Sequence, residues 1–203
     1  TELINPYYKL NPKFKLVKKK TTHLFLKLSE LQNELKNWYN KNDGSWTNIA
    51  DGITKSWLND DLHDRCITRD LEWGTPVPDT KKFGNKFKNK VFYVWFDAPI
   101  GYISITANKL NNWTNWWKNE DVKLVNFMAK DNVPFHSIIF PACLIGTKDN
   151  YNLVNTIAAV DYLNYEDKKF SKSNNTGVFG DDAKNSGICS DMWRFYLIRV
   201  RPE

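Results

Sequence analysis

The sequence predicts an α/β fold in which short buried strands alternate with helices. The run Val91–Phe96 is rich in β-branched and aromatic side chains, which favour a buried strand, and Pro99 suits the first turn of a helix running towards Trp117. The same order recurs in the apolar strand Leu124–Ala129 and the apolar stretch Val133–Ile145, which we expect to be helical. Two successive strand–helix units therefore predict a sheet with parallel neighbours.

The ends of these strands are where we expect a ligand. Strands joined by helices pair in parallel through crossovers, and such sheets bind ligands at the carboxyl ends of their strands. Asp97 and Asp131 fall at the ends of the first two predicted strands. A further strand is expected within Thr156–Tyr165, after a helix that must accommodate Pro141.

Loops, two helices and a turn-rich linker are expected before residue 89, and a cationic loop and a helix after residue 165. Ser29 and Gln32 form a capping-box pattern, and Leu31 and Leu35 follow at helical spacing. The expected elements are a loop or hairpin over 1–20 containing Pro6, Pro12 and Lys18–Lys20, a strand over 23–28, a helix ended by Asn42-Asp43-Gly44, a helix over 47–58, turns and short extended pieces over 65–88, a mobile loop after Tyr165, and a helix over 190–200.

Composition bounds the class of protein. The 203 residues are 41% hydrophobic and 26% charged, which is typical of one globular domain or two small ones. The net charge of +6 favours a polyanionic partner such as nucleic acid. Three widely spaced cysteines, with no Cys-x-x-Cys pair, argue against a disulfide framework and a zinc site and favour a reducing compartment. The longest apolar stretch, Val91–Ile105, is too short to cross a membrane.

The segment Lys169-Phe170-Ser171-Lys172-Ser173 carries the chemistry most open to interpretation. It places two ammonium groups and two hydroxyls within five residues, a set that can neutralise phosphate oxygens in a transition state. By spacing alone, a solvated lysine-rich loop is the better interpretation.

Four segments together resemble a known family. Residues 169–173 resemble the Lys-Met-Ser-Lys-Ser signature of class I aminoacyl-tRNA synthetases, with Phe170 as an apolar replacement for Met. Other segments resemble the methionine enzyme of that class, and the resemblance covers essentially all 203 residues and is closest to eukaryotic cytosolic members. These segments are Cys66–Asp70, Tyr93–Tyr102 and Phe127–His136.

The resemblance implies the second half of a Rossmann-like nucleotide-binding fold. It assigns residues 1–88 to the remainder of a connective insertion, 89–165 to the catalytic core, and 166–203 to the signature loop and the start of a stem-contact region. The implied activity is methionine–tRNA ligation in the cytoplasm: ATP with Mg²⁺ activates methionine to methionyl-adenylate, and the product is transferred to tRNA(Met). Multi-synthetase or accessory protein partners are also expected.

The resemblance also implies site residues, each with a simpler alternative. Lys172, with Lys169, Ser171 and Ser173, is expected to be catalytic and to act on the ATP phosphates. The methionine pocket is expected to comprise Trp95, Ala98, Pro99, Tyr102, Phe135, His136 and Phe140, with Tyr102 and His136 able to hydrogen-bond the sulfur. The ATP site is expected to add Asp131 and Arg69. The alternatives are core packing for Trp95, Phe135 and His136, a helix cap for Asp131, and an ion pair with Asp70 or Glu72 for Arg69.

Three features of the family are absent from this sequence. The His-x-Gly-His signature is not found, since the only histidines are His23, His63 and His136, so we expect the chain alone to be inactive. Phe14 stands within Pro12–Val17 where a zinc-knuckle cysteine would be expected, so no zinc is expected. An anticodon-binding domain would follow Glu203.

Two other functions stay open at this point. One is a class I synthetase for leucine, isoleucine or valine, although Trp95–Tyr102 resembles the methionine type. The other is a non-catalytic module that docks RNA or a protein. Amino-acid-dependent exchange of pyrophosphate into ATP distinguishes the methionine enzyme from the enzymes for leucine, isoleucine or valine. Titration with methionine, ATP and tRNA distinguishes an enzyme from a docking module.

Overall fold

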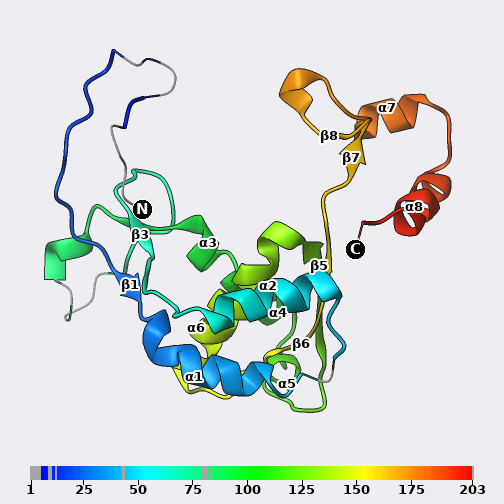
Figure 1. Cartoon of the computed structure of the whole chain (residues 1–203). Coiled ribbons are helices and arrows are strands. Elements are labelled where there is room, and N and C mark those ends of the chain that lie inside the picture. Colours follow the sequence, from blue (N-terminus) through cyan, green and yellow to red (C-terminus); the bar gives the residue numbers. More distant parts are fainter. Residues whose placement is uncertain are drawn as a thin grey trace.

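A computed structural model describes residues 6–8, 11, 13–42, 44–78, 82 and 84–202. Pro12 and Asp43, which the sequence analysis placed in turns, lie outside the described residues. Figure 1 shows a body of packed helices and short strands, an extended N-terminal segment, and a lobe that holds the C-terminal helices. Residues 13–20 form neither helix nor strand, which confirms the loop expected there. No described helix is long and apolar enough to cross a membrane.

Two helices build one side of the body. The helix α1 (Leu28–Tyr39) and the helix α2 (Asn48–Asn59) confirm the two predicted helices. The predicted capping box is wrong, because Ser29 lies inside α1 and its hydroxyl donates to Asp64 at 2.7 Å. Gln32 instead accepts the backbone N–H of Leu62 at 2.7 Å. Both side chains therefore fix the later segment against α1 and leave its N-terminus uncapped.

Two short antiparallel strand pairs precede the predicted parallel unit. The strand β1 (Phe25–Leu26) pairs with β2 (Arg65–Cys66), and β3 (Thr68–Arg69) pairs with β4 (Val91–Phe92). A 3₁₀ turn, η1 (Gly84–Phe87), lies between β3 and β4.

The predicted strand Val91–Phe96 is wrong beyond Phe92. Residues Val94–Asp97 form the short helix α3, so Asp97 ends a helical turn rather than a strand. The reason is that β3 offers partners only to Val91 and Phe92, so the following residues have no ladder to join. The Phe92 and Phe96 rings, one helical turn apart, then pack at 5.4 Å.

The helix expected between Pro99 and Trp117 is interrupted. The helix α4 (Ile100–Lys109) ends at Leu110, whose backbone is extended, and the chain resumes as the short helix α5 (Thr114–Trp117). Pro99 lies immediately before α4, as its fixed φ favours.

The parallel unit is present as one strand pair. The strands β5 (Leu124–Ala129) and β6 (Val154–Val160) pair in parallel, so β5 matches its prediction, whereas β6 begins and ends earlier than the predicted Thr156–Tyr165. The connection contains a 3₁₀ turn η2 (Lys130–Asn132), a π-helical turn η3 (Phe135–Ile139) and the helix α6 (Phe140–Thr147).

Pro141 is accommodated by the change in helix type. The N–H of Phe140 bonds to the Phe135 carbonyl, an i to i+5 spacing, immediately before the proline that has no N–H to donate. The predicted helical character of Val133–Ile145 is thus confirmed over the whole stretch, with a widened turn that carries Phe135 and His136.

One hydrophobic core joins both sides of the expected boundary at residue 88. It packs α1 and α2 against the connection and β6, with Leu28, Leu35, Ile138 and Ile157 almost fully buried. A smaller core forms around Ile103, Trp117, Phe140 and Leu144. The elements that precede β4 therefore support the segment η3 directly.

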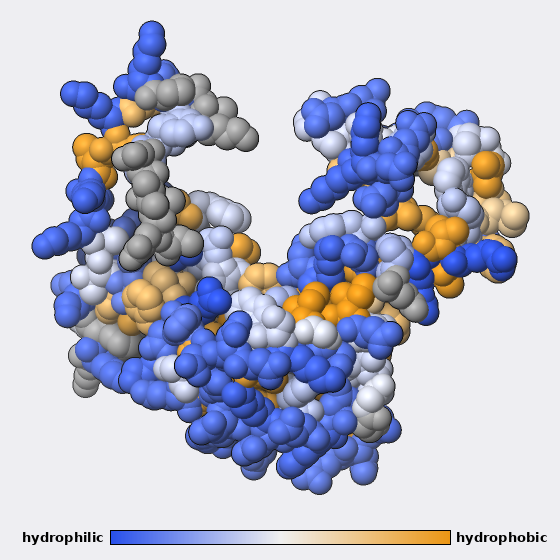
Figure 2. Space-filling view, viewed as in Figure 1, coloured by the Kyte–Doolittle hydropathy of each residue, from blue (hydrophilic) through white to orange (hydrophobic). Residues whose placement is uncertain are grey.

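The residues 161–202, here called the C-terminal lobe, include no buried residue. They form the hairpin β7 (Asn164–Tyr165) and β8 (Lys168–Lys169), a 3₁₀ turn η4 (Lys172–Asn174), and the helices α7 (Gly180–Asn185) and α8 (Ser190–Arg199). Glu166 and Asp167, both with positive φ, make the two-residue turn that such hairpins favour. Figure 2 shows apolar surface in the region of α8, where Phe195 and Ile198 are exposed.

Candidate active site

Most of the predicted methionine-site residues line a single cavity of about 290 Å³, here called the aromatic cup. Its wall is supplied by α3, the start of α4, and the turns η2 and η3. The lining residues are Val94, Trp95, Ala98, Pro99, Tyr102, Asn132, Phe135 and His136.

Ring contacts shape the apolar part of the cup. The Trp95 and Phe135 rings lie 6.1 Å apart on opposite elements, and both pack against the main core. Tyr93, the residue before α3, meets Trp95 edge to face at 5.8 Å. Trp95 and Phe135 therefore line the cavity and support the core at once, so the core-packing alternative is observed for both rings and leaves one side of each facing the cavity.

A hydrogen-bonded chain supplies the polar part of the cup. His136 Nδ1 lies 2.9 Å from the Asn132 carbonyl oxygen, which can only accept, so Nδ1 carries the proton. In the neutral ring, Nε2 is then an acceptor, and the Tyr102 hydroxyl donates to it at 2.9 Å. Asn132 thus sets the tautomer of His136, which in turn orients Tyr102.

The composition of the cup differs from the predicted set at three positions. Phe140 does not line it. Its ring is buried behind Tyr102, with ring centroids 6.0 Å apart, and borders a neighbouring cavity of about 330 Å³. Val94 and Asn132 do line it and were not predicted. Their positions beside Trp95 and Asp131 in the sequence were the available signal.

Asp131 lies in η2, directly after the carboxyl end of β5, as predicted. Its side chain is exposed and makes no hydrogen bond or ion pair with the described residues. The helix-cap alternative is not observed, because no side chain caps η3. Its carboxylate is thus open to a donor such as a hydroxyl group.

The residues 169–173, here called the KFSKS segment, lie in the C-terminal lobe. Phe170 is the anchor of the segment, with its ring 6.0 Å from Tyr165 and 6.1 Å from Phe179. A Cβ on Gly177 would approach that ring to 2.4 Å, and Gly177 also has a φ of +127°, so only glycine suits this turn.

The two lysines of the KFSKS segment are exposed, with the Lys169 ammonium over the Tyr162 ring, and Ser171 is half-buried. Ser171 and Ser173 lie 3.2 Å apart through their hydroxyl oxygens, and Lys169 and Lys172 are exposed. Figure 1 shows the hairpin beyond the carboxyl end of β6 and apart from α3, so the structure does not bring Lys172 into the cup.

Arg69 forms no ion pair with Asp70 or Glu72, which was the simpler alternative for this residue. Its guanidinium lies 4.0 Å over the Tyr93 ring and donates to the Thr68 carbonyl at 2.8 Å and to the Cys66 sulfur at 3.4 Å. Because Tyr93 touches Trp95, Arg69 is linked to the wall of the cup by one intervening ring.

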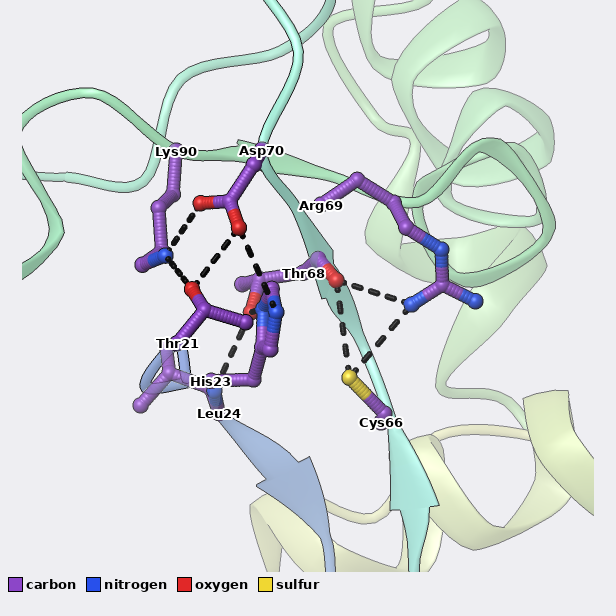
Figure 3. Close-up of polar contacts among 8 residues, drawn as sticks. All are labelled: Thr21, His23, Leu24, Cys66, Thr68, Arg69, Asp70 and Lys90. Atoms are coloured by element: carbon purple, nitrogen blue, oxygen red, sulfur yellow. Dashed lines mark hydrogen bonds and ion pairs between the residues drawn. The ribbon is translucent and has the colours of Figure 1, made fainter. Parts of the chain in front are cut away.

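Asp70 belongs to a separate polar cluster, drawn in Figure 3, with Lys90, Thr21 and His23. Lys90 is almost buried; it pairs with Asp70 and donates to the Thr21 hydroxyl at 2.8 Å. Thr21 donates in turn to Asp70 at 2.7 Å. These hydrogen bonds, from Lys90 first and then Thr21, lower the pKa of Asp70 to about 2. The cluster ties the N-terminal segment to β3 and to the residue before β4.

The described residues contain no group of three or more His, Cys, Asp or Glu side chains placed to hold a metal ion. Cys66, Cys143 and Cys189 are free thiols. Burial raises the pKa of the Cys143 thiol to about 11, so this side chain behaves as an apolar core residue.

A parallel strand pair joined by a helical crossover, with polar side chains after the strand ends, is the unit from which open α/β nucleotide-binding folds are built. The family model described as "tRNA synthetases class I (M)" matches residues 1–203, and the chain belongs to this family.

Relatives give the same result. The chain is 56% identical to a Xenopus laevis protein named methionine–tRNA ligase, cytoplasmic. The match covers all of this chain and 23% of that protein. It is 57% identical to a Dictyostelium discoideum protein named probable methionine–tRNA ligase, cytoplasmic. That match covers all of this chain and 27% of that protein. The chain therefore spans about a quarter of the length of these relatives.

A solved structure supports the fold. The crystal structure of Mycobacterium tuberculosis methionyl-tRNA synthetase bound by methionyl-adenylate matches with a TM-score of 0.69 at 22% identity. The match covers 85% of this chain and 32% of that one. The α/β fold predicted as part of a class I synthetase catalytic domain is thereby confirmed.

Proposed function

We propose that this chain is part of a methionine–tRNA ligase and that the aromatic cup binds the methionine side chain. The observation that carries the proposal is the cup itself. Side chains from α3, α4 and η3 converge on one cavity, and the polar pair Tyr102–His136 is fixed by a hydrogen bond to the backbone. The family of the chain and the names of its relatives give the substrate class.

The chemistry of the cup suits a thioether. Methionine is flexible and its sulfur is polarizable, so it gains from contact with the rings of Trp95 and Phe135. The sulfur is a weak acceptor, and the Tyr102 proton is already donated to His136. A hydrogen bond to the sulfur therefore requires the Tyr102 hydroxyl to turn from His136 towards the substrate.

The nucleotide end of the reaction is assigned to the strand ends and the KFSKS segment. The open carboxylate of Asp131 accepts hydrogen bonds from the ribose hydroxyls of ATP, which carries Mg²⁺ as part of the substrate. The methionine carboxylate attacks the α-phosphate, forming methionyl-adenylate and releasing pyrophosphate. Lys172, assisted by Lys169, stabilises the charge on the departing phosphates, with Ser171 and Ser173 as hydroxyl donors.

Lys172 reaches those phosphates in this proposal because the KFSKS segment turns about residues 161–163, which connect β6 to β7. The connection includes no buried residue, so this motion breaks little apolar packing. Arg69 supports the wall of the cup through Tyr93 and does not bind phosphate from its present position.

The remaining assignments follow from the same proposal. Residues 1–88 belong to a connective insertion, 89–165 to the catalytic core, and 166–203 to the signature loop and stem-contact region. The acceptor of the methionyl group is tRNA(Met), and the compartment is the cytoplasm, as the names of the relatives state for those proteins. Accessory protein partners belong to the proposal as well.

A chimeric enzyme tests the proposal. Residues 1–203 replace the matching segment of the whole Dictyostelium relative, and exchange of pyrophosphate into ATP is measured with each of methionine, leucine, isoleucine and valine. We expect exchange with methionine only. Exchange driven best by another amino acid would reassign the substrate.

An inactive chimera would contradict the proposal if the chimera is folded and the unmodified relative is active under the same conditions. Methionine binding to the 203-residue chain, measured by calorimetry, provides a second arm. Binding of tRNA without any binding of methionine would favour a docking module over an enzyme.

A further inference from the structure

The Tyr162 ring lies at the junction between the strand pair and the C-terminal lobe, and two ammonium groups converge on it. Lys130 Nζ lies 5.0 Å and Lys169 Nζ 4.7 Å from the ring centroid. Lys130 follows the end of β5, whereas Lys169 ends β8 and begins the KFSKS segment. One aromatic side chain thus links the two parts of the nucleotide site described above.

The position of Tyr162 is fixed through Asp161. The Asp161 carboxylate accepts the Lys130 ammonium at 2.6 Å and the backbone N–H of Tyr162 at 2.6 Å. These two hydrogen bonds, Lys130 first, lower the pKa of Asp161 below its ordinary value. Its backbone N–H also donates to the Pro202 carbonyl at 2.9 Å, so the residue is held from both ends of the lobe.

Lys169 is held differently from Lys130. It makes no ion pair with the described residues, and its ammonium group lies over the Tyr162 ring. The side chains of Lys130, Lys169 and Asp161 together carry a net charge of +1, because one carboxylate faces two ammonium groups. Both ammonium groups lie within 5.0 Å of one ring centroid, so they repel each other, and an anion that contacts both would relieve that repulsion.

We propose that Tyr162 is a positioning residue that holds Lys169 beside Lys130, so that both ammonium groups face one polyphosphate. The inference rests on the proposed function, which it extends to two residues outside the KFSKS segment and the aromatic cup. The ring restricts the rotamers of Lys169 before the anion arrives, which lowers the entropic cost of binding.

Binding of inorganic tripolyphosphate to the 203-residue chain, measured by calorimetry at low salt, tests the placement of the two lysines. Tyr162→Leu removes the ring face, whereas Tyr162→Phe keeps it and is the matched control. We expect Leu to weaken binding about threefold and Phe to leave it unchanged. Equal losses in both variants, unchanged binding, or tighter binding by Leu would each overturn the positioning role.

The role of Lys130 is tested in the same assay. Lys130→Met should weaken tripolyphosphate binding about tenfold, as removal of a charge-assisted contact does, whereas Lys109→Met, an exposed lysine on α4, should not. Pyrophosphate and ATP as separate titrants distinguish the product from the substrate as the source of the phosphates. If Lys130→Met weakens tripolyphosphate binding no more than Lys109→Met does, Lys130 does not contact the phosphates.

Kinetics of the chimera separate this inference from the proposed function. Tyr162→Leu should raise the KM for ATP and leave the KM for methionine unchanged, since the cup is untouched; a parallel rise in both would indicate a structural role. Absence of methionine-dependent exchange in the unmodified chimera would overturn the proposed function alone, because tripolyphosphate binding needs no amino acid.

Discussion

The body of the molecule, residues 23–160, and the C-terminal lobe hold their candidate functional groups by different means. In the body, the rings of the aromatic cup are continuous with a core whose central side chains are almost fully buried. In the lobe, no residue is buried, and the KFSKS segment is anchored by the edge contacts of Phe170 and by the Tyr162 ring.

This difference suits the two proposed tasks. A cup that recognises a side chain must keep its shape, and a packed core supplies that rigidity. A segment that meets phosphates only during the reaction must move, and segments with few buried contacts open at low cost in free energy. Substitutions in the body should therefore change stability and methionine affinity, whereas substitutions in the lobe should change the reaction rate.

The largest expected effect is on stability, from matched Leu→Ala changes in the two regions. Leu35 in α1 is fully buried, whereas Leu197 in α8 is 44% exposed. Leu35→Ala should lower the free energy of unfolding by about 2–5 kcal/mol through lost burial and a residual cavity. Leu197→Ala should cost less than about 0.5 kcal/mol, as exposed positions usually do. Urea denaturation measures both, and equal costs would show that the lobe is packed like the body.

The sequence predicted those elements and site residues that depend on short-range patterns. Amphipathic spacing predicted α1 and α2, and a run of apolar residues predicted β5, because each signal lies within the element itself. Six of the seven predicted cup residues line one cavity, since all six fall in two short motifs, Tyr93–Tyr102 and Phe127–His136.

The predictions that were wrong concern residues whose structure depends on partners far away in the sequence. Val94 and Trp95 have strand-forming side chains, but β3 is too short to pair with them, so they fold into α3. Ser29 has the residue type of a helix cap, but Asp64, 35 positions away, takes its hydroxyl. The link from Arg69 through Tyr93 to the cup likewise arises from tertiary contact and left no pattern in the sequence.

The second prediction concerns the lobe. In the chimeric enzyme, Lys172→Ala should slow methionyl-adenylate formation about 100-fold, as loss of one transition-state donor does, while methionine affinity and thermal stability stay nearly unchanged. Lys184→Ala, an exposed lysine on α7, is the control. Single-turnover rates and methionine titration measure the two quantities. Parallel losses in rate and affinity would show that Lys172 supports the structure.

The third prediction concerns the cup and has the opposite signature. Tyr102→Phe removes the hydroxyl that donates to His136 and leaves the ring in place. We expect methionine affinity to fall about tenfold, because the site loses its polar orientation and leaves Nε2 without a partner. The rate at saturating methionine should change less. Tyr151→Phe, outside the cup, is the control, and a rate loss without an affinity loss would contradict the assignment.

The smallest expected effect comes from the Asp70–Lys90 pair beside β3 and β4, and the pH dependence of that effect identifies its cause. Lys90→Met should lower the free energy of unfolding, because it removes the hydrogen bonds that Lys90 donates to Asp70 and Thr21. Because the folded-state pKa of Asp70 is lowered to about 2, the stability gained from its ionisation is present above its ordinary pKa and lost as pH falls through about 2.

Replacing Lys90 returns the pKa of Asp70 towards its ordinary value. The difference in Tm between the original chain and Lys90→Met should therefore be constant from pH 5 to 7 and narrow as pH falls from about 4 to 2. Lys86→Met, near β4 and outside the cluster, should show no such narrowing. A difference independent of pH would mean that Lys90 acts through its buried methylene groups and that the body is held at this point by packing alone.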